Sequence, residues 1–552
     1  MRSKHLLLFF FFLLISHSYM SESLPLLTSG RWIVDASTGR RVKLRCVNWA
    51  AHLPAVVAEG LDRQPLESIA AKVASLGFNC VRLTWATHHW TDDDQYANLT
   101  VAGSLLSLGL RKAAAGIAVN NPRILSMTVR DAYEAVVRTA ADTGLMLVLD
   151  NHVSRPQWCC GEDDGNGFFG DTFFDADEWL RGLEIVARRF RPIPQVVGLS
   201  LRNELRGKNQ TISEWRRNMA RGCDAIHSAN PDLLVVVSGL SYDTDLSFLA
   251  QNPLQLGFGG KLVLEIHTYA FSRGDRQDWT ERPLAAMCSR MDREFEERAG
   301  FVARGSAAVP LFVSEFGGDQ TGTSEGDNRF LSCFLAMAAQ RDLDWALWAL
   351  QGSYYIRNGK PGFEETFGVL DGGWSRERSP RFRERFRLAQ EVLLEPGTTE
   401  KPRYVIVFHP ESGGCLTANR ESVVQLGDCE GRSRWEYEVE EEGSALPVRL
   451  IAGTEEMYLA AAGEGRPVVA VASSGPGRGD VSRWRVRSVS GFPFQIAGDG
   501  DGAGEGGKDL CLERAEEGNG VAVLAKECVC LKGPECTSDP RAQWFVFVAS
   551  NV

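Results

Sequence analysis

The feature that most constrains the fold is a series of eight short apolar runs between residues 42 and 350. Stretches rich in Ala, Leu, Arg and Glu, which are compatible with helices, separate the runs. Apolar runs without regular alternation, joined by helical segments, are typical of parallel strands that are covered on both faces. Eight such units predict a (β/α)8 barrel in a domain that covers residues 24–395. The runs are residues 42–49, 79–85, 145–152, 196–204, 233–239, 262–269, 310–317 and 344–350.

Polar side chains stand at the ends of most of these runs, and active sites of such barrels lie at the C-terminal ends of the strands. One polar strand end alone indicates only a strand that reaches solvent. Taken singly, Arg82 or His267 could also form a structural ion pair or hydrogen bond, and Trp348 could be a core aromatic. Their convergence on one mouth favours a functional ring, which comprises Arg82, His152, Asn203, Glu204, His267, Tyr269, Glu315 and Trp348.

Two carboxylates in this ring, Glu204 and Glu315, directly end an apolar run. Glycoside hydrolysis needs such a pair, because one group protonates the leaving oxygen while the other attacks the anomeric carbon. In a retaining enzyme the two carboxyl groups lie about 5 to 5.5 Å apart. The sequence therefore predicts a glycosidase in which Arg82 and Tyr269 keep Glu315 ionised.

The motifs of the ring resemble glycoside hydrolase family 5, whose members are retaining β-glycanases on (β/α)8 barrels. The resemblance rests on VRL (81–83), DNH (150–152), RNE (202–204), HTY (267–269), SEFG (314–317) and LWAL (347–350). It implies that Glu204 is the general acid/base and Glu315 the nucleophile. It also implies that Arg82, His152, Asn203, His267, Tyr269 and Trp348 support them, with Trp348 as a platform for the sugar. Leu205 stands where the family usually has proline.

The segment after the second run, TWATHHW, contains His88 and Trp90, which we interpret as substrate-binding residues, with loop packing as the alternative. A zinc site is not expected, because His88 and His89 are adjacent and no nearby carboxylate or cysteine completes a ligand set. Residues 162–171 are acidic but lack the ligand spacing of a calcium loop. The sequence predicts no metal and no cofactor.

The N-terminus predicts export. Basic residues precede ten apolar residues, 6–15, which are too few to span a bilayer, so we interpret residues 1–23 as a signal peptide. Thirteen cysteines suggest several disulfides with at least one thiol unpaired, and Asn98 and Asn209 stand in N-x-[ST] sequons. The net charge of −11 is intermixed along the chain, which argues against nucleic acid or a membrane as partner. We expect a secreted monomer that binds a polysaccharide or oligosaccharide.

A linker at residues 396–403 precedes a Gly-rich segment of short strand-like pieces, residues 404–552. Trp435, Trp484 and Trp544 recur in it, which indicates a threefold all-β module. The segment resembles a ricin B-type β-trefoil, which implies disulfides Cys415–Cys429 and Cys511–Cys528. The Asp that sugar-binding repeats carry is replaced, so the resemblance implies the fold without implying lectin activity. The replacing residues are Thr417, Ala460 and Glu513.

Together these features predict a secreted retaining hydrolase of a β-linked polysaccharide, a β-1,4-glucan or a related cell-wall glycan. Three alternatives remain: a catalytically silent carbohydrate-binding protein, a β-mannanase and a transglycosylase. Because glucan and mannan specificity depend on a few contacts in variable loops, the sequence does not separate these substrates.

Overall fold

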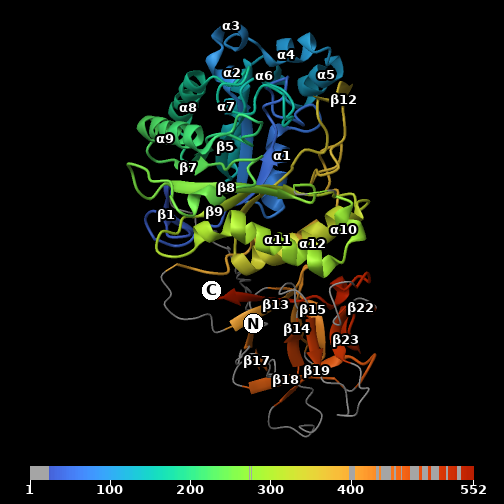
Figure 1. The fold of residues 1–552 in the computed structure, drawn as a ribbon. Helices are drawn as coiled ribbons and strands as arrows, with labels where there is room; N and C mark the ends of the chain where they lie inside the picture. The colour runs from blue at the N-terminus through green and yellow to red at the C-terminus, as the bar shows by residue number, and fades with distance from the viewer. Residues whose placement is uncertain are drawn as a thin grey trace, which may run out of the picture.

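The computed structural model describes residues 24–272, 274, 276–396 and, with gaps, 404–551. All eight predicted runs form strands, and these strands close into one parallel barrel in the order β10-β3-β4-β5-β6-β7-β8-β9. Figure 1 shows the barrel domain in blue to yellow, with the C-terminal strands in orange and red on one side of it. The predicted barrel is thus confirmed. Its strands are β3 (Arg45–Trp49), β4 (Cys80–Ala86), β5 (Met146–Val153), β6 (Val196–Ser200), β7 (Leu234–Val237), β8 (Leu262–Tyr269), β9 (Leu311–Gly317) and β10 (Asp344–Leu347).

Helices cover the outside of the barrel after every strand except β7. There a single 3-10 turn, η1 (Ser247–Leu249), precedes β8, because residues 238–261 are rich in Gly, Ser and Asp, which favour turns. The long helices are α1 (Leu66–Ser75), α7 (Val129–Asp142), α8 (Ala176–Phe190), α9 (Ile212–Ala229), α11 (Leu284–Arg298), α12 (Glu325–Arg341) and α13 (Phe382–Gln390). Short helices lie between β4 and α7: α2 (Thr87–Thr91), α3 (Asp93–Tyr96), α4 (Val101–Ser107), α5 (Arg111–Asn120) and α6 (Pro122–Leu125); α10 (Asp278–Glu281) precedes α11.

Helix α8 shows how the sequence builds this outer layer. The Asp175 side chain caps its N-terminus by accepting a hydrogen bond from the Glu178 N–H (2.8 Å), which satisfies a donor that has no partner within the helix. Trp179, Leu183 and Phe190 are buried on one face, and their spacing is that of an amphipathic helix. The apolar stripe therefore docks the helix against the barrel.

The barrel interior is filled below the mouth by side chains from the strands, among them Val148, Val236 and Phe312. An N-terminal hairpin of β1 (Leu26–Ser29) and β2 (Trp32–Asp35) adds Leu26 and Ile33 to this cluster. The interior is thus a packed core, and the space for a ligand is restricted to the mouth.

The C-terminal region forms a 12-stranded antiparallel arrangement that packs on the barrel domain. In its last strand, Val546 and Val548 share a buried cluster with Phe334 of α12, and Arg541 pairs with Glu325 at 2.6 Å. The strands are β13 (Tyr404–His409), β14 (Gly414–Ala418), β15 (Val424–Gly427), β16 (Arg434–Glu436), β17 (Arg449–Ala452), β18 (Glu455–Ala461), β19 (Val468–Ala472), β20 (Trp484–Arg487), β21 (Gln495–Gly498), β22 (Leu510–Glu517), β23 (Gly520–Glu527) and β24 (Val546–Ser550).

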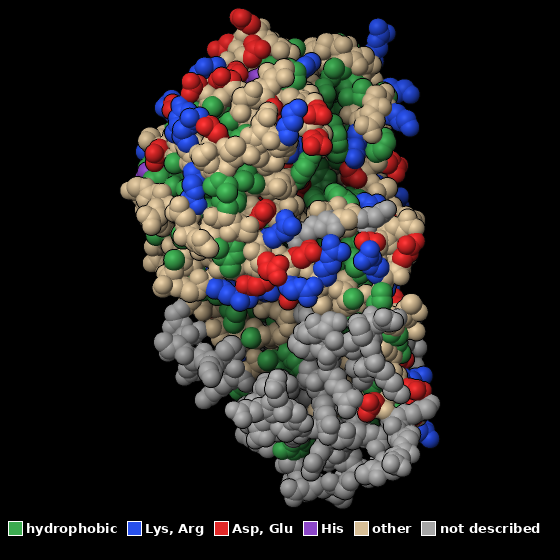
Figure 2. All heavy atoms as spheres, in the orientation of Figure 1, with side chains coloured by type: hydrophobic (Ala, Val, Ile, Leu, Met, Phe, Trp, Pro, Cys, Tyr) green, Lys and Arg blue, Asp and Glu red, His purple; other side chains and the backbone are tan. Residues whose placement is uncertain are grey.

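Twelve of the thirteen cysteines form disulfides, and Cys223 is buried and free. The expected pairs Cys415–Cys429 and Cys511–Cys528 are both present. The predicted signal peptide, residues 1–23, and all but the first residue of the predicted linker lie outside the described residues. Figure 2 shows basic and acidic side chains interspersed over the face in view. Among the described helices, none has both the length and the apolar character that a membrane crossing requires.

Candidate active site

A cavity of about 760 Å³ opens at the C-terminal ends of the barrel strands, a size within the range of small-molecule sites. Most of the predicted ring lines it: His152, Asn203, Glu204, His267, Tyr269, Glu315 and Trp348. Arg82 is fully buried in β4 and reaches the same groups from beneath. The structure therefore brings these eight predicted residues together.

Glu315, at the end of β9, is held by two hydrogen bonds. Arg82 Nη1 donates to Oε1 and the Tyr269 hydroxyl donates to Oε2, each at 2.8 Å. Burial raises the pKa of Glu315 above its ordinary value, while His267 and Arg82 oppose this shift. Both bonds fix the carboxylate with its oxygens towards the cavity, and both favour its charged form.

Arg82 anchors a charged layer under the cavity floor. Its Nη2 lies 2.9 Å from Asp150 and 3.6 Å from Glu265, and all three side chains are fully buried. A buried guanidinium stays charged because such carboxylates compensate it. Sequence reasoning treated Glu204 and Glu315 as the carboxylates that matter in the strands and missed Asp150 and Glu265. The sequence did contain one signal for Asp150: it stands two residues before His152, so both side chains lie on the same face of the strand.

Glu204 follows β6 in a left-handed backbone conformation with φ of 42°, which non-glycine residues adopt rarely and most often at functional sites. His267 Nδ1 lies 3.0 Å from its Oε1. Burial raises the pKa of Glu204 to about 7, against the charges of Arg206 and Arg82. Glu204, His267 and Glu315 each offer an atom within 4.8 Å of the others. The two carboxylates thus face one another across a short gap.

The turn at Glu204 is fixed without the proline that Leu205 replaces. Leu205 is buried, and its carbonyl accepts a hydrogen bond from the Tyr242 N–H (2.8 Å). The buried Arg206 donates from Nη1 to the Glu204 carbonyl at 2.8 Å and pairs with Asp164 at 2.6 Å. Hydrogen bonds to the backbone therefore supply the rigidity that a proline ring would give.

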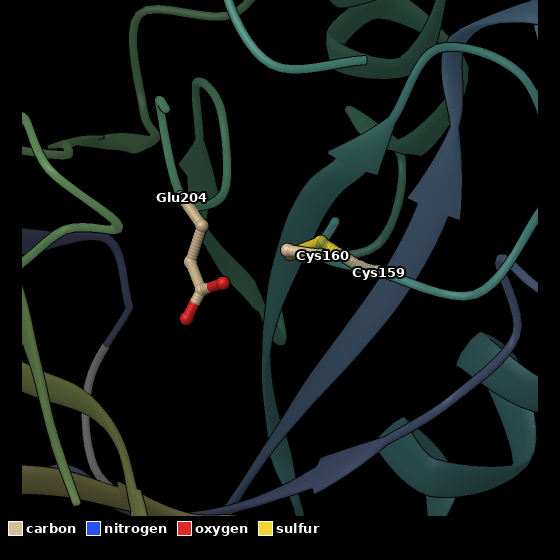
Figure 3. A group of neighbouring side chains, drawn as sticks. All are labelled: Cys159, Cys160 and Glu204. Carbon is tan, nitrogen blue, oxygen red and sulfur yellow. A yellow bond between two sulfur atoms is a disulfide. The ribbon is translucent and has the colours of Figure 1, made fainter. Parts of the chain in front are cut away.

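Asn203 lies between Arg82 and a disulfide of adjacent cysteines. Its Oδ1 accepts from Arg82 Nη2 at 3.0 Å, and its Nδ2 lies 3.6 Å from each sulfur of Cys159–Cys160. Figure 3 shows this disulfide beside the Glu204 side chain, and both cysteines line the cavity. Because Arg82 occupies the amide oxygen and sulfur is only a weak acceptor, the amide nitrogen is the group of Asn203 that can donate to a ligand. The sequence indicated disulfides but not this pair.

His152 and Trp348 form a stacked pair on the cavity wall. The ring centroids lie 5.6 Å apart with an interplanar angle of 17°, and His152 Nδ1 lies 2.6 Å from Asp150. Burial lowers the pKa of His152 well below its ordinary value, so a neutral imidazole faces the cavity. Of the two histidines in the predicted ring, His267 is the one that contacts Glu204.

His88 and Trp90 do not line the cavity, so the expectation of a substrate-binding role is corrected. Both belong to α2, which packs on α8 in the outer layer of the barrel. Trp90 is buried against Tyr133 and Phe190, and His88 Nε2 lies 3.5 Å from Glu178. Strand β4 leads directly into α2 in the outer layer. Packing in that layer explains the positions of the His88 and Trp90 side chains.

Three groups of side chains within the described residues are close enough to hold a metal ion, and none contains His88 or His89. They are Cys159, Cys160 and Glu204; Glu204, His267 and Glu315; and Asp243, Glu265 and His267. The first contains a disulfide, and hydrogen bonds from Arg82 and Tyr269 already occupy Glu315.

Comparisons with known proteins identify the family of the chain. A family model described as cellulase (glycosyl hydrolase family 5) matches residues 47–353. A glycosyl hydrolase 5 family protein from Chamaecyparis obtusa is 41% identical over 540 residues, which cover 96% of this chain and 94% of that protein. An endoglucanase from Paenibacillus polymyxa is 21% identical over 371 residues, covering 64% of this chain and 84% of its own.

Solved structures show the same fold. An endocellulase from the archaeon Pyrococcus horikoshii aligns with a TM-score of 0.54 at 18% identity, covering 66% of this chain and 99% of that chain. The catalytic domain of the major endoglucanase from Xanthomonas campestris pv. campestris aligns with a TM-score of 0.52 at 21% identity, covering 66% and 98%. Fold and site define a (β/α)8 barrel with two carboxylates facing each other at its mouth. The chain belongs to glycosyl hydrolase family 5.

Proposed function

We propose that the protein is a retaining β-glycan hydrolase with Glu315 as nucleophile and Glu204 as general acid/base. The observation that carries the proposal is that one carboxylate oxygen of Glu204 and one of Glu315 lie within 4.8 Å of each other. Inverting enzymes keep about 6.5 to 9.5 Å between these groups to admit a water, whereas retaining enzymes place them about 5 to 5.5 Å apart. The surroundings of the two carboxylates also differ: Arg82 and Tyr269 bond Glu315, whereas His267 contacts Glu204. Different surroundings suit two different roles.

In the first step, the Glu315 carboxylate attacks the anomeric carbon while Glu204 gives its proton to the departing glycosidic oxygen. The pKa of Glu204 near 7 keeps it protonated at neutral and mildly acidic pH, as a general acid requires. In the second step, Glu204 takes a proton from water, which attacks the same carbon and releases Glu315. The sugar leaves with its original anomeric configuration.

The other ring residues have supporting roles in this proposal. Arg82 and Tyr269 hold Glu315 ionised and aimed, and His267 bonds Glu204. Asn203 Nδ2 bonds the hydroxyl next to the anomeric carbon, a contact that strengthens in the transition state. His152 and Trp348, whose rings stack on each other, support the sugar ring.

We propose a β-1,4-glucan or a related cell-wall glycan as substrate, in line with the relatives named endoglucanase and endocellulase. A β-mannan and transglycosylation remain the alternatives. Secretion is supported by the disulfides, and glycosylation by the exposure of Asn98 and Asn209. We treat residues 24–395 as the catalytic domain.

We also propose that the C-terminal module is a β-trefoil. The indole N–H of Trp435 donates to the Leu416 carbonyl at 3.0 Å, and that of Trp484 donates to the Leu459 carbonyl at 3.1 Å. The same bond at equivalent places in two successive repeats supports internal symmetry, as do the twelve strands. The module packs against the barrel domain, where Val546 and Val548 contact the cluster of Phe334.

The test is release of reducing sugar from a panel of β-glucans and β-mannans by wild type, Glu315→Ala and Glu204→Ala. We expect both variants to lose at least a thousandfold in kcat, and proton NMR of the wild-type product to show the retained anomer first. Glu184→Gln on the exposed face of α8 is the matched control and keeps full activity. Equal release by wild type and Glu315→Ala would favour the silent carbohydrate-binding protein, and an inverted first product would exclude the retaining mechanism.

A further inference from the structure

The loops that follow β5 and β10 meet over one side of the cavity. The guanidinium carbon of Arg357, in β11 (Ile356–Arg357), lies 3.6 Å from the ring centroid of Trp158. Tyr354 meets the same indole edge-on, with ring centroids 5.5 Å apart. Because β3 and β4 stand between β10 and β5 in the barrel, the contact spans the mouth above those two strands. We name Trp158, Tyr354 and Arg357 the bridge.

A buried carboxylate fixes the bridge. Glu365 accepts hydrogen bonds from the Tyr354 hydroxyl at 2.7 Å and from Arg357 Nη1 at 2.6 Å, and its other oxygen accepts from the Phe367 N–H at 3.1 Å. Charge-assisted bonds away from solvent resist rearrangement. Trp158, Arg357 and Glu365 all line the cavity, so the bridge is a rigid wall of the site.

The opposite side of the cavity carries exposed aromatic rings. Tyr242, after β7, and Phe271, after β8, line the cavity with 36% and 49% of their surface exposed. No other aromatic residue in the described part of the chain is as exposed. The hydrogen bond from the Tyr242 N–H to the Leu205 carbonyl holds it next to Glu204, and Phe271 stacks on Tyr269 at 4.8 Å. Exposed apolar surface beside a pocket is typical of a ligand-binding groove.

These two sides lie at different ends of the reacting bond. In the proposed function, the sugar that is attacked lies against Trp348 and Asn203, and Trp158 packs against the cluster of Tyr269, Trp348 and Ala349. The bridge lies above β3 and β4, across the closed barrel from β7 and β8, which Tyr242 and Phe271 follow. The leaving group lies on the Glu204 side, where Tyr242 is placed. The bridge therefore limits the sugar chain on the attacked side, while the leaving side continues over exposed rings.

We propose that the cavity is closed at one end and accepts the non-reducing end of a β-glycan chain. The chain end stops at the bridge, and the remaining polymer departs across Tyr242 and Phe271. Each hydrolysis then releases a short fragment of fixed length from the non-reducing end. This inference rests on the proposed function and adds to it the mode of attack.

The test compares two hexasaccharides that carry a fluorophore at the reducing end, one of them with its non-reducing 4- and 6-hydroxyls capped as an acetal. They are made in whichever series, gluco or manno, the wild type hydrolyses. We expect one short unlabelled product first from the free hexasaccharide and at least tenfold slower cleavage of the capped one. Calorimetric binding to the Glu204→Gln protein should show the same preference for the free end without turnover.

Variants of the bridge provide a second test of the proposal. Arg357→Ala and the more conservative Trp158→Phe should narrow the difference between capped and free substrate at least threefold, whereas Arg123→Ala on exposed α6 should not change it. Equal cleavage of both substrates by wild type, with mixed products, would overturn the one-ended cavity. Short labelled fragments among the first products would also overturn it, because they come from cleavage near the reducing end. No hydrolysis of either substrate, with the wild type equal to Glu315→Ala, would instead overturn the proposed function and this inference with it.

Discussion

Arg206 donates a hydrogen bond from its guanidinium to the backbone carbonyl of Glu204 at 2.8 Å. The same guanidinium bonds the Gly161 carbonyl at 2.9 Å and the Asp164 carboxylate. One buried side chain thus ties the turn that carries Glu204 to the loop after β5. It also places a positive charge that lowers the pKa of Glu204 against the effect of burial.

Replacing Arg206 should therefore affect both the rate and the pH profile. We expect Arg206→Met to lower kcat about tenfold to a hundredfold and to move the basic limb of the profile to higher pH, because a nearby positive charge is lost. Arg206→Lys keeps the charge but not the forked bonds, so it should slow kcat while leaving the basic limb in place. An unchanged limb in Arg206→Met, with the protein folded by circular dichroism, would contradict this role.

The pH dependence of the wild type follows from the two carboxyl groups. Glu204 must be protonated to act as acid, and its pKa of about 7 places the basic limb of kcat/KM near pH 7, with a tenfold loss per unit above it. Glu315 must be ionised, and its raised pKa places the acidic limb above the ordinary glutamate value. Stopped assays of an aryl β-glycoside between pH 4 and 9 measure both limbs. In Glu204→Gln the basic limb should disappear for a substrate with a good leaving group.

The barrel and most of its ring could be predicted from the sequence because each signal is local. An apolar run identifies a strand, and a polar residue at its end lies at the mouth. The His88 and Trp90 prediction failed because the residues after β4 form α2, whose direction depends on packing against α8. No pattern in the neighbouring sequence distinguishes residues that follow a strand and line the mouth from residues that follow a strand and join the outer layer.

The bridge could not be predicted from the sequence for a different reason. Trp158 and Arg357 are far apart in the chain, and their contact depends on the closure of the barrel. Asp150 and Glu265 were missed because a charged residue inside an apolar run looks like an exception until Arg82 is placed beside it. Pairing over long sequence separations has no local signature.

Asn203 provides a test of the contact that is expected to strengthen in the transition state. We expect Asn203→Ala to lower kcat/KM for an aryl β-glycoside about tenfold to a hundredfold, the effect of one lost hydrogen bond in a dry site. The same substitution should have little effect on the 2-deoxy glycoside, because that substrate lacks the partner hydroxyl. Equal losses on both substrates would place Asn203 in a purely structural role.

A stability prediction concerns Asp342, below the barrel. Its carboxylate accepts hydrogen bonds from Lys43 Nζ at 2.8 Å and from Arg41. Burial opposes its charge, but Lys43 and Arg41 outweigh burial and lower its pKa. Asp342→Asn should lower the free energy of unfolding by about 3 kcal/mol at pH 7. Since the folded pKa is depressed, the difference should begin to shrink as pH falls below about 4 and should disappear only below the folded pKa of Asp342.

Urea unfolding at pH 7 and pH 3 measures this effect. Asp292→Asn is the matched control, because Asp292 is part of a partly exposed pair with Arg341 at 2.8 Å, and such pairs contribute less than about 1 kcal/mol. A difference between wild type and Asp342→Asn that persists unchanged at pH 3 would mean that charge pairing is not the cause.

The exposed rings of Tyr242 and Phe271 should govern binding of the leaving chain. Each ring is partly exposed and lines the cavity, and neither ring bonds Glu204 or Glu315, so we expect its removal to leave both carboxylates in place. We expect Tyr242→Ala and Phe271→Ala to raise KM for a hexasaccharide about fivefold to tenfold while changing KM for an aryl monoglycoside less than twofold. Ile212→Ala, at an equally exposed apolar residue outside the cavity, is the control. A parallel rise for both substrates would show that the rings act on the reacting sugar itself.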